Sequence, residues 1–401
     1  MIYMAGANDL QPYVNFNIKQ MKMIGSNDNC NIVARTFTNQ KKPLSETIFI
    51  GKNKKTVLEQ HSNTNSGDPE NLINFCINAF HAFPADHYAL IFWDHGTGAI
   101  DPIIHDRTAT SSLFSFQKYQ ISKYLPFLKL INIKKTPHKG ICFDDQTKHF
   151  LSEEKLIYAF LSIQNTFSNR KKLFDIIAFD ACLMAMIEVV KIVAPFADFM
   201  VASQEAEPGT GWNYTHAFAP FLKGTISPKL LGIHLVNAYA KTYTATQDYT
   251  LSLLATEQIH LFESNINHVA LLITEVIKQH GNDFLSAVKE SRSKSKCTYF
   301  NEPSYIDIQH FYKNLLDKIQ KMQKQNKNRN TTLLSIEATL IEGIILLEKI
   351  IITKKNGPYH SNAHGLSIYF PEYIMHSIYK KTSFAKNNSS WVSLLSLLLT
   401  W

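Results

Sequence analysis

The chain has 401 residues, of which 45% are hydrophobic and 12% are aromatic, and this composition argues for a globular protein with ample core. Only 18% of the residues are charged, which excludes long disordered tracts. The formal charge of +8 comes from scattered lysines, and the one dense basic run, at 318–329, lacks interleaved aromatic residues, so we expect a solvated helix end or loop there and no nucleic-acid partner.

The first half of the chain alternates strand-like apolar runs with helical patterns. Strands are predicted at 2–5, 31–36, 46–50, 88–93, 174–179 and 199–203, the third as part of an edge hairpin. Helices are predicted at 10–23, 68–79 and 183–193, the second beginning with an acidic N-cap and a proline. This alternation is typical of the α/β class, with a mostly parallel sheet sandwiched between helices.

The second half, from about residue 229, is richer in helix, with strand-like pieces at 250–254 and 365–370. The length permits two or three domains, or one large α/β domain with additions. We divide the chain into a core at 1–228, with a less regular insertion at about 99–150, and a helix-rich region at 229–401 that completes the core or packs on it. No glycine-rich phosphate loop opens a helix, which argues against a nucleotide enzyme.

The five cysteines are odd in number and include no CxxC spacing, so they form neither a disulfide framework nor a zinc site. No apolar run reaches the roughly 18 residues that a membrane span needs, and we expect no membrane partner. No signal peptide is visible, which points to the cytoplasm. Secretion stays open if the recorded start lies too far downstream or if another export route is used.

Chemically active side chains follow the two best-defined strands. Asp94, His95 and Gly96 follow the run at 88–93, and Asp180 and Cys182 follow the run at 174–179. Because ligands bind beyond the carboxyl ends of parallel strands, an imidazole and a thiol are expected at one rim of the sheet.

These residues suggest a cysteine hydrolase. At the start of the predicted helix, exposed N–H groups and the helix dipole would favour the thiolate of Cys182. His95 would act as the general acid, and the backbone N–H groups of Gly96 and Cys182 would form an oxyanion hole. A lone buried cysteine is more often a small hydrophobic residue, and a histidine before glycine is more often a turn residue; the joint placement favours the catalytic interpretation.

Acidic residues near the same rim suggest recognition of a cationic side chain. Asp180 lies two residues before Cys182, and it could cap the following helix as well as face a pocket. Glu205 and Glu207 follow the strand at 199–203 and would add negative charge, although solvated loop acids would need no function.

Several segments together resemble the clostripain-type cysteine peptidases of the caspase-like superfamily. They are IYMAGANDLQ at the start, SGDPENL at 66–72, FPADHYALIFWDHGTG at 83–98, KGICFDD at 139–145, FDACLMAMIEV at 179–189, VASQEAEPGTGWNY at 201–214 and HGLSIYFP at 364–371. The resemblance implies a caspase-like α/β/α sandwich and an endopeptidase that cleaves proteins and peptides after Arg or Lys. By this resemblance, His95 and Cys182 would form the catalytic dyad, and Asp180 would form the floor of the pocket for the basic side chain.

The resemblance also implies that members can cleave themselves between the histidine and the strand leading to the cysteine. Lys148 is a suitable basic residue there, with Lys139, Lys171 and Lys172 as competitors. Some relatives depend on calcium, for which the adjacent acids at 144–145 could supply oxygen ligands; we expect no required cofactor and assign no metal site. The first strand is shorter than usual in this family, and residues 107–130 resemble it less than their flanks do.

The sequence thus predicts a monomeric cysteine endopeptidase with Arg/Lys specificity. The alternative is a binding or scaffold protein that keeps the caspase-like fold without the activity. The presence of both dyad residues and the pocket acid argues against it.

Overall fold

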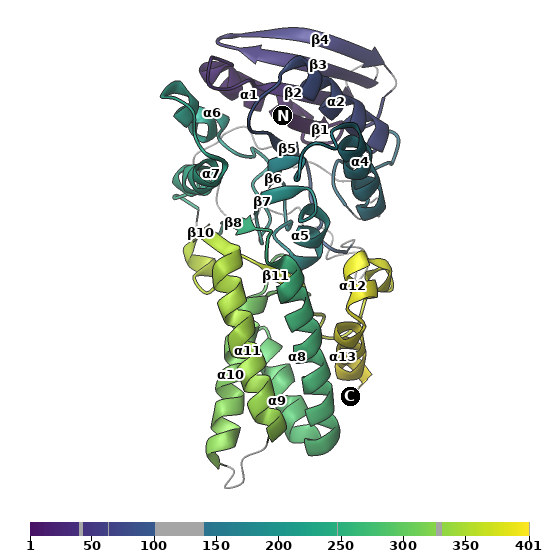
Figure 1. Ribbon diagram of the computed structural model, residues 1–401, viewed down its shortest axis with the longest axis vertical. Coiled ribbons are helices and arrows are strands. Elements are labelled where there is room, and N and C mark those ends of the chain that lie inside the picture. The colour runs from purple at the N-terminus through teal and green to yellow at the C-terminus, as the bar shows by residue number, and fades with distance from the viewer. Residues whose placement is uncertain (40–42, 63, 101–139, 247, 326–330, 401) are drawn as a thin grey trace.

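The protein is organised around one nine-stranded sheet (Figure 1), in the order β10-β8-β7-β6-β5-β1-β2-β3-β4. The computed structural model describes residues 1–39, 43–62, 64–100, 140–246, 248–325 and 331–400. The strands are β1 (Ile2–Gly6), β2 (Val33–Asn39), β3 (Pro43–Gly51), β4 (Lys54–Ser62), β5 (Ala89–Trp93), β6 (Phe174–Asp180), β7 (Ala197–Ala202), β8 (Thr250–Ala255) and β10 (Ile351–Asn356). The five central strands, from β2 to β7, are parallel, and the strands added at both edges are antiparallel.

Helices cover both faces of the sheet, as the α/β prediction requires. One face packs against α1 (Gln11–Ile24), α6 (Tyr214–Phe218) and α7 (Pro228–Thr242). The other face packs against α2 (Pro69–Ala82), α4 (Glu153–Thr166) and α5 (Ile187–Val193). Successive strand residues point to opposite faces, so the continuous apolar runs of β5 and β6 supply both cores at once.

The second half of the chain forms a helical lobe below the sheet (Figure 1). It contains α8 (Ile259–His280), α9 (Asn282–Arg292), α10 (Ile308–Gln325), α11 (Thr331–Ile350), α12 (Ser383–Asn387) and α13 (Ser389–Thr400). A two-stranded sheet of β9 (Tyr305–Asp307) and β11 (Ser367–Tyr369) joins the lobe to the upper part, since Ser367 N–H donates to the Ala185 carbonyl over 2.8 Å. The lobe shares a continuous apolar core with the α5 face of the sheet, and β8 and β10 extend the main sheet itself.

Most sequence-based elements lie where the patterns put them. The Asp68 side chain accepts a hydrogen bond from the Glu70 N–H and caps α2, as the acidic N-cap and proline predict. The expected edge hairpin is the pair β3–β4, whose second strand the sequence analysis did not identify because its side chains are mostly exposed and polar. The strand predicted at 365–370 pairs with β9 and lies outside the main sheet.

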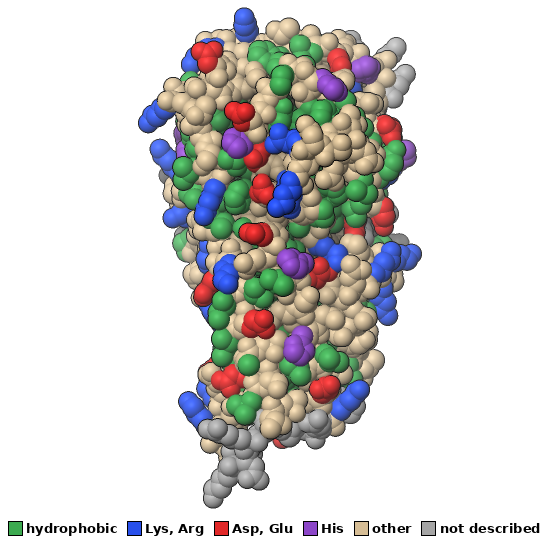
Figure 2. Space-filling view, in the orientation of Figure 1, with side chains coloured by type: hydrophobic (Ala, Val, Ile, Leu, Met, Phe, Trp, Pro, Cys, Tyr) green, Lys and Arg blue, Asp and Glu red, His purple; other side chains and the backbone are tan. Residues whose placement is uncertain are grey.

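Charge is distributed without a single basic face in the view of Figure 2, where Lys and Arg side chains lie among Asp and Glu side chains. Within the described residues, no helix is both long enough and apolar enough to cross a bilayer.

Candidate active site

The carboxyl ends of four parallel strands meet at one edge of the sheet. The edge carries Asn8 and Asp9 after β1, Asp94 and His95 after β5, Asp180 at the end of β6 with Cys182 after it, and Ser203, Glu205 and Glu207 after β7. Strands β5 and β6 are neighbours, with Trp93 in register with Asp180, and the Asp94 N–H donates to the Asp180 carbonyl over 3.3 Å. His95 and Cys182 therefore follow adjacent strands, on the same edge.

The backbone at Cys182 differs from the prediction. Helix α5 begins at Ile187, whereas Cys182 lies in a turn whose next residue, Leu183, has a φ of 63°. The Leu183 N–H donates to the Glu205 carbonyl over 3.2 Å, and the Ala185 N–H donates to the Ser203 carbonyl over 2.8 Å. The prediction of a helix from 183 was wrong because these amides pair with the loop after β7, so no helix dipole acts on the sulfur.

The sulfur of Cys182 is half-buried and rests against the main chain of that loop. The Glu207 N–H donates to Sγ over 3.2 Å. Burial raises the pKa of the Cys182 thiol to about 12; the N–H groups of Glu207 and Gly96 lower it, while the charges of Glu207 and Glu205 raise it further. A pKa in this range keeps the group a thiol at neutral pH, so a nucleophilic role would require a base that removes its proton.

Gly96 lies so close to the backbone of Cys182 that a side chain would not fit between them. A Cβ at Gly96 would stand 2.3 Å from the Cys182 carbonyl oxygen and 2.9 Å from Cγ of Met184. Its N–H lies near enough to Sγ to favour the thiolate. Gly96 thus brings a backbone donor beside the sulfur, and its oxyanion role stays a prediction.

His95 is held by a residue that the sequence analysis did not single out. Its Nε2 lies 2.5 Å from Oδ1 of Asp9, which follows β1, the neighbour of β5. Burial alone would lower the pKa of His95, but the hydrogen bond and charge of Asp9, aided by Asp94, outweigh it and raise that pKa. The position of Asp9 in the loop that follows the first predicted strand was the available signal, because that strand ends at the same edge.

Asn8, which follows β1, is hydrogen-bonded to Asp94, which follows β5. Its Nδ2 donates to Oδ1 of Asp94 over 2.6 Å and to the Phe143 carbonyl over 3.0 Å. The other oxygen of Asp94 accepts from the Phe143 N–H. Burial raises the pKa of Asp94 to about 7 despite these donors and the charge of His95. This network ties the loop after β5 to the chain that follows the insertion.

Two of the three predicted pocket acids lie together. Both oxygens of Asp180 accept from the Trp212 N–H at 3.0 Å, and Oδ2 also accepts from the Tyr214 hydroxyl at 2.8 Å. Oε2 of Glu207 accepts from the Trp212 indole over 2.9 Å, and the two carboxyl groups lie close enough for the charge of Asp180 to act on Glu207. Gly211, with a φ of 64°, admits this arrangement because a Cβ there would stand 2.8 Å from Oδ2 of Asp180.

The environment of this acid pair raises both pKa values. Burial raises the pKa of Asp180 to about 7, opposed by the donors from Trp212 and Tyr214. Burial, followed by the charge of Asp180, raises the pKa of Glu207 well above its usual range. Two adjacent buried carboxyls cannot both be charged cheaply, so they retain a proton when no cation is near.

The third predicted acid, Glu205, is turned away from this pair. Its Oε2 lies 3.1 Å from Nε2 of His360, which also lies 2.5 Å from Oδ1 of Asp248. Burial raises the pKa of Glu205, although the hydrogen bond from His360 lowers it. Neither His360 nor Asp248 was singled out from the sequence, since they come from the distant second half and lie in no recognisable motif.

The predicted processing site lies in an exposed turn. Lys148 has a φ of 59°, and its N–H donates to the Asp144 carbonyl over 2.9 Å. Of its competitors, Lys171 is exposed, whereas Lys172 bonds to carbonyls after α5. Lys139 lies outside the described residues.

The acids at 144–145 have separate surroundings. Oδ1 of Asp144 accepts from the N–H groups of Gln146 and Thr147, at 3.0 and 2.9 Å, within its own turn. In the described part of the chain, these two acids belong to no group of three converging His, Cys, Asp or Glu side chains. Calcium dependence therefore stays a prediction.

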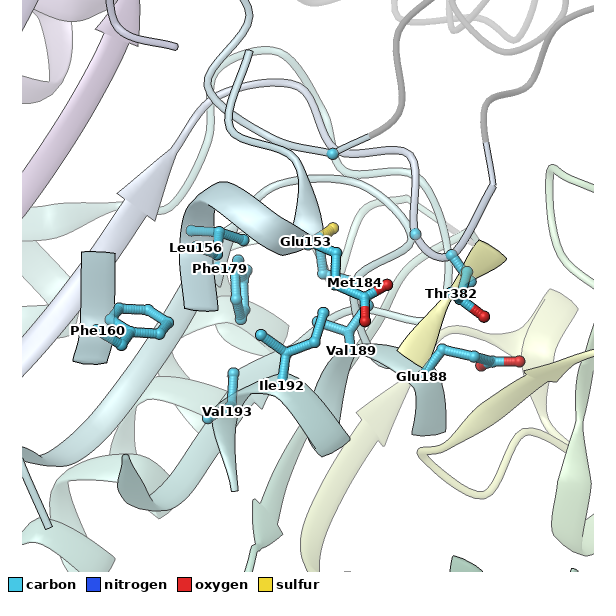
Figure 3. Close-up of a pocket in the computed structure, with 13 residues that line it drawn as sticks. Glu153, Leu156, Phe160, Phe179, Met184, Glu188, Val189, Ile192, Val193 and Thr382 are labelled. Atoms are coloured by element: carbon cyan, nitrogen blue, oxygen red, sulfur yellow. The ribbon is translucent and has the colours of Figure 1, made fainter. Parts of the chain in front are cut away.

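A cavity lies apart from these groups, between α4 and α5 (Figure 3). Its walls are mainly apolar, and the side chains of Glu153, Glu188 and Thr382 lie toward one end. Neither His95 nor Cys182 lines it, so the cavity is not part of the candidate site at the sheet edge.

Comparisons with known proteins identify the family and support the fold. The clostripain family model (Peptidase_C11) matches residues 2–110 and 130–397. An inactive zymogen C11 protease from Parabacteroides distasonis is 19% identical, with a TM-score of 0.63 and 96% of each chain covered. A secreted C11 cysteine protease from Bacteroides thetaiotaomicron, solved with an irreversible peptide inhibitor, is 17% identical, with a TM-score of 0.62 and 98% of each chain covered. No curated protein sequence matches the chain. The two structures confirm the predicted caspase-like α/β fold.

Proposed function

The chain belongs to the clostripain family of cysteine peptidases, and from this premise we propose that it is an endopeptidase that cleaves after Arg or Lys with Cys182 as nucleophile and His95 as its base. The observation that carries the specificity is the buried pair of Asp180 and Glu207, beside the thiol at one edge of the sheet. A guanidinium or ammonium group would allow both carboxyls to ionise and would pair with them.

The proposed reaction begins with proton transfer from the Cys182 thiol to His95. Sγ then bonds to the carbonyl carbon of the substrate, and the oxygen takes the negative charge, where the N–H groups of Gly96 and Cys182 stabilise it. His95 returns the proton to the leaving amine as the C–N bond breaks, leaving a thioester. Water, deprotonated by His95, cleaves the thioester and restores the thiol.

Asp9 has a positioning role in this scheme. Its carboxylate, 2.5 Å from Nε2 of His95, stabilises the imidazolium that forms when the thiol loses its proton. The Glu207 N–H, which donates to Sγ, would stabilise the thiolate formed in this step.

Hydrolysis of a fluorogenic Arg peptide by the wild type and by Cys182→Ala tests this function. We expect the variant to lose the activity, while Cys30→Ala, which removes another half-buried free thiol, retains it. Equal rates for the wild type and Cys182→Ala would remove the peptidase assignment for this thiol, and background rates from both would favour the silent scaffold.

We further propose self-processing after Lys148. The turn offers an exposed basic residue, but its left-handed conformation must open to fit a peptidase groove. Mass spectrometry of purified protein should show fragments 1–148 and 149–401 from the wild type, and neither from Cys182→Ala or Lys148→Ala. Lys171→Ala is the control that should still be cut, and a fully active intact wild type would contradict a need for processing.

A further inference from the structure

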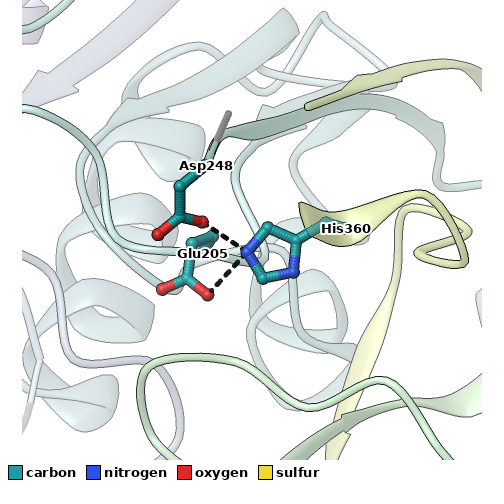
Figure 4. A group of neighbouring side chains, drawn as sticks. All are labelled: Glu205, Asp248 and His360. Atoms are coloured by element: carbon teal, nitrogen blue, oxygen red, sulfur yellow. Dashed lines mark hydrogen bonds and ion pairs between the residues drawn. The ribbon is translucent and has the colours of Figure 1, made fainter. Parts of the chain in front are cut away.

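Three side chains from distant segments converge beside the loop that contacts Cys182 (Figure 4). Glu205 lies after β7, Asp248 just before β8, and His360 in the short helix η2 (Pro358–His360). Nε2 of His360 lies 2.5 Å from Oδ1 of Asp248 and 3.1 Å from Oε2 of Glu205, and one donor atom from each residue lies within 4.8 Å of the others. Within the described ranges this is the one such group of three.

A single proton on His360 cannot satisfy both carboxylates that lie beside it. Nε2 can carry one hydrogen, yet two carboxylate oxygens converge on it, so the hydrogen points well to only one of them. Two carboxylates and one imidazolium also leave a net negative charge around Glu205, which is only 4% exposed. A divalent cation would give each donor its own bond, and with a neutral imidazole the charges would sum to zero.

The spacing suits a metal ion after a small adjustment. Metal–ligand bonds of about 2.1 Å place neighbouring ligand atoms of a tetrahedron about 3.4 Å apart. The separation of 3.1 Å between His360 and Glu205 is close to this value, and the separation of 2.5 Å to Asp248 must widen by just under 1 Å. The Asp248 side chain is 44% exposed, so little packing opposes that shift, and water can reach the fourth position from its side.

The buried ligands are oriented before any ion binds. The carboxylate of Glu205 accepts from the Ala206 N–H at 2.7 Å and from the Asn301 N–H at 3.1 Å. The ring of Phe300 packs against His360 with centroids 5.5 Å apart. Such supporting contacts fix the direction of ligand lone pairs and strengthen metal sites.

We propose that Glu205, Asp248 and His360 bind a first-row divalent transition metal ion of the Zn²⁺ type. One imidazole nitrogen with two carboxylate oxygens suits Zn²⁺, Mn²⁺ or Co²⁺ better than Ca²⁺ or Mg²⁺, which take oxygen ligands. The ion fastens the 205–207 loop, whose Glu207 N–H donates to the Cys182 sulfur, to the second half of the chain through His360. It is a site for a structural or regulatory ion, separate from the proposed chemistry.

Titration calorimetry of the full chain with ZnCl₂ tests the site, in a Cys182→Ala background that removes the neighbouring thiol as a ligand. We expect one Zn²⁺ per chain, no competition by equimolar Ca²⁺, and visible absorption bands when Co²⁺ is bound instead. Adding His360→Gln should weaken Zn²⁺ binding at least about 100-fold, because loss of a direct ligand exceeds the loss of a supporting contact.

Two further variants make the result decisive. Asp248→Asn changes a partly exposed ligand, so it should weaken binding without unfolding the protein, as circular dichroism would verify. His87→Gln is the matched control, since His87 lies 2.8 Å from a single carboxylate, Asp175, and its loss should leave binding unchanged. Equal Zn²⁺ affinity with and without His360, or no Zn²⁺ bound at millimolar concentration, would overturn the proposal.

Discussion

Replacing Asp180 with Asn isolates the charge that is proposed to select basic substrates. The carboxylate accepts hydrogen bonds from the Trp212 N–H and the Tyr214 hydroxyl, and its charge acts on the neighbouring Glu207. Asparagine has nearly the same shape, but its amide can present only one oxygen to these donors. The variant therefore loses the negative charge and disturbs one hydrogen bond, while the nucleophile two residues later is unchanged.

The size of the effect follows from the burial of the site. Removing one partner of a buried charge pair costs about 3–5 kcal/mol. Because Glu207 remains beside the substrate cation, we take the lower end, about 3 kcal/mol, which is roughly a 100-fold loss of kcat/KM at about 1.4 kcal/mol per tenfold change.

Two matched peptides measure this loss, one with Arg before the scissile bond and one with citrulline, which keeps the shape of Arg without its charge. We expect Asp180→Asn to lower kcat/KM for the Arg peptide and to leave the citrulline peptide almost unchanged. The rate of Cys182 alkylation by iodoacetamide checks that the nucleophile is intact. An equal loss for both peptides, or none for Arg, would refute the assignment of Asp180 to the pocket.

Three further outcomes follow from the same site. The pKa of about 7 at Asp180 means that the carboxyl is neutral below that pH, so kcat/KM for Arg over citrulline should rise with pH through about 7; a constant ratio would contradict the charge pairing. Asp9→Asn removes a partner that raises the pKa of His95, so the acid limb of the pH–rate profile and the NMR titration of His95 should move to lower pH, and kcat should fall at least about tenfold. An unshifted His95 titration would exclude this role for Asp9. Gly96→Ala should lower the free energy of unfolding by about 1–3 kcal/mol in chemical denaturation, because its Cβ meets a backbone oxygen. Gly209→Ala is the control, because the nearest heavy atom to a Cβ there would be 3.5 Å away, and it should change the free energy of unfolding little. Equal stability of the two variants would count against the close contact between Gly96 and the Cys182 backbone.

Local patterns were sufficient for the strands and for the edge where they end. The runs that became β5 and β6 are apolar at nearly every position because both faces are buried. Such a strand can be recognised from the apolar run alone, without information from the rest of the chain. Their polar ends, at His95 and Cys182, follow from chain order alone. The same reasoning failed for the segment after Cys182, where an apolar run indicates burial without distinguishing a helix from an extended connection.

What the sequence determined by itself is therefore the α/β class, the family and the strand ends that carry the thiol and the imidazole. Only the tertiary structure decided the contacts between segments far apart in the chain. It joined Asp9 to His95, paired Asp180 with Glu207, and turned Glu205 toward His360, 155 positions away. The physical reason is that periodicity reports which face of an element is buried, whereas hydrogen-bond partners across a sheet edge depend on strand order and on the folding of every connecting loop.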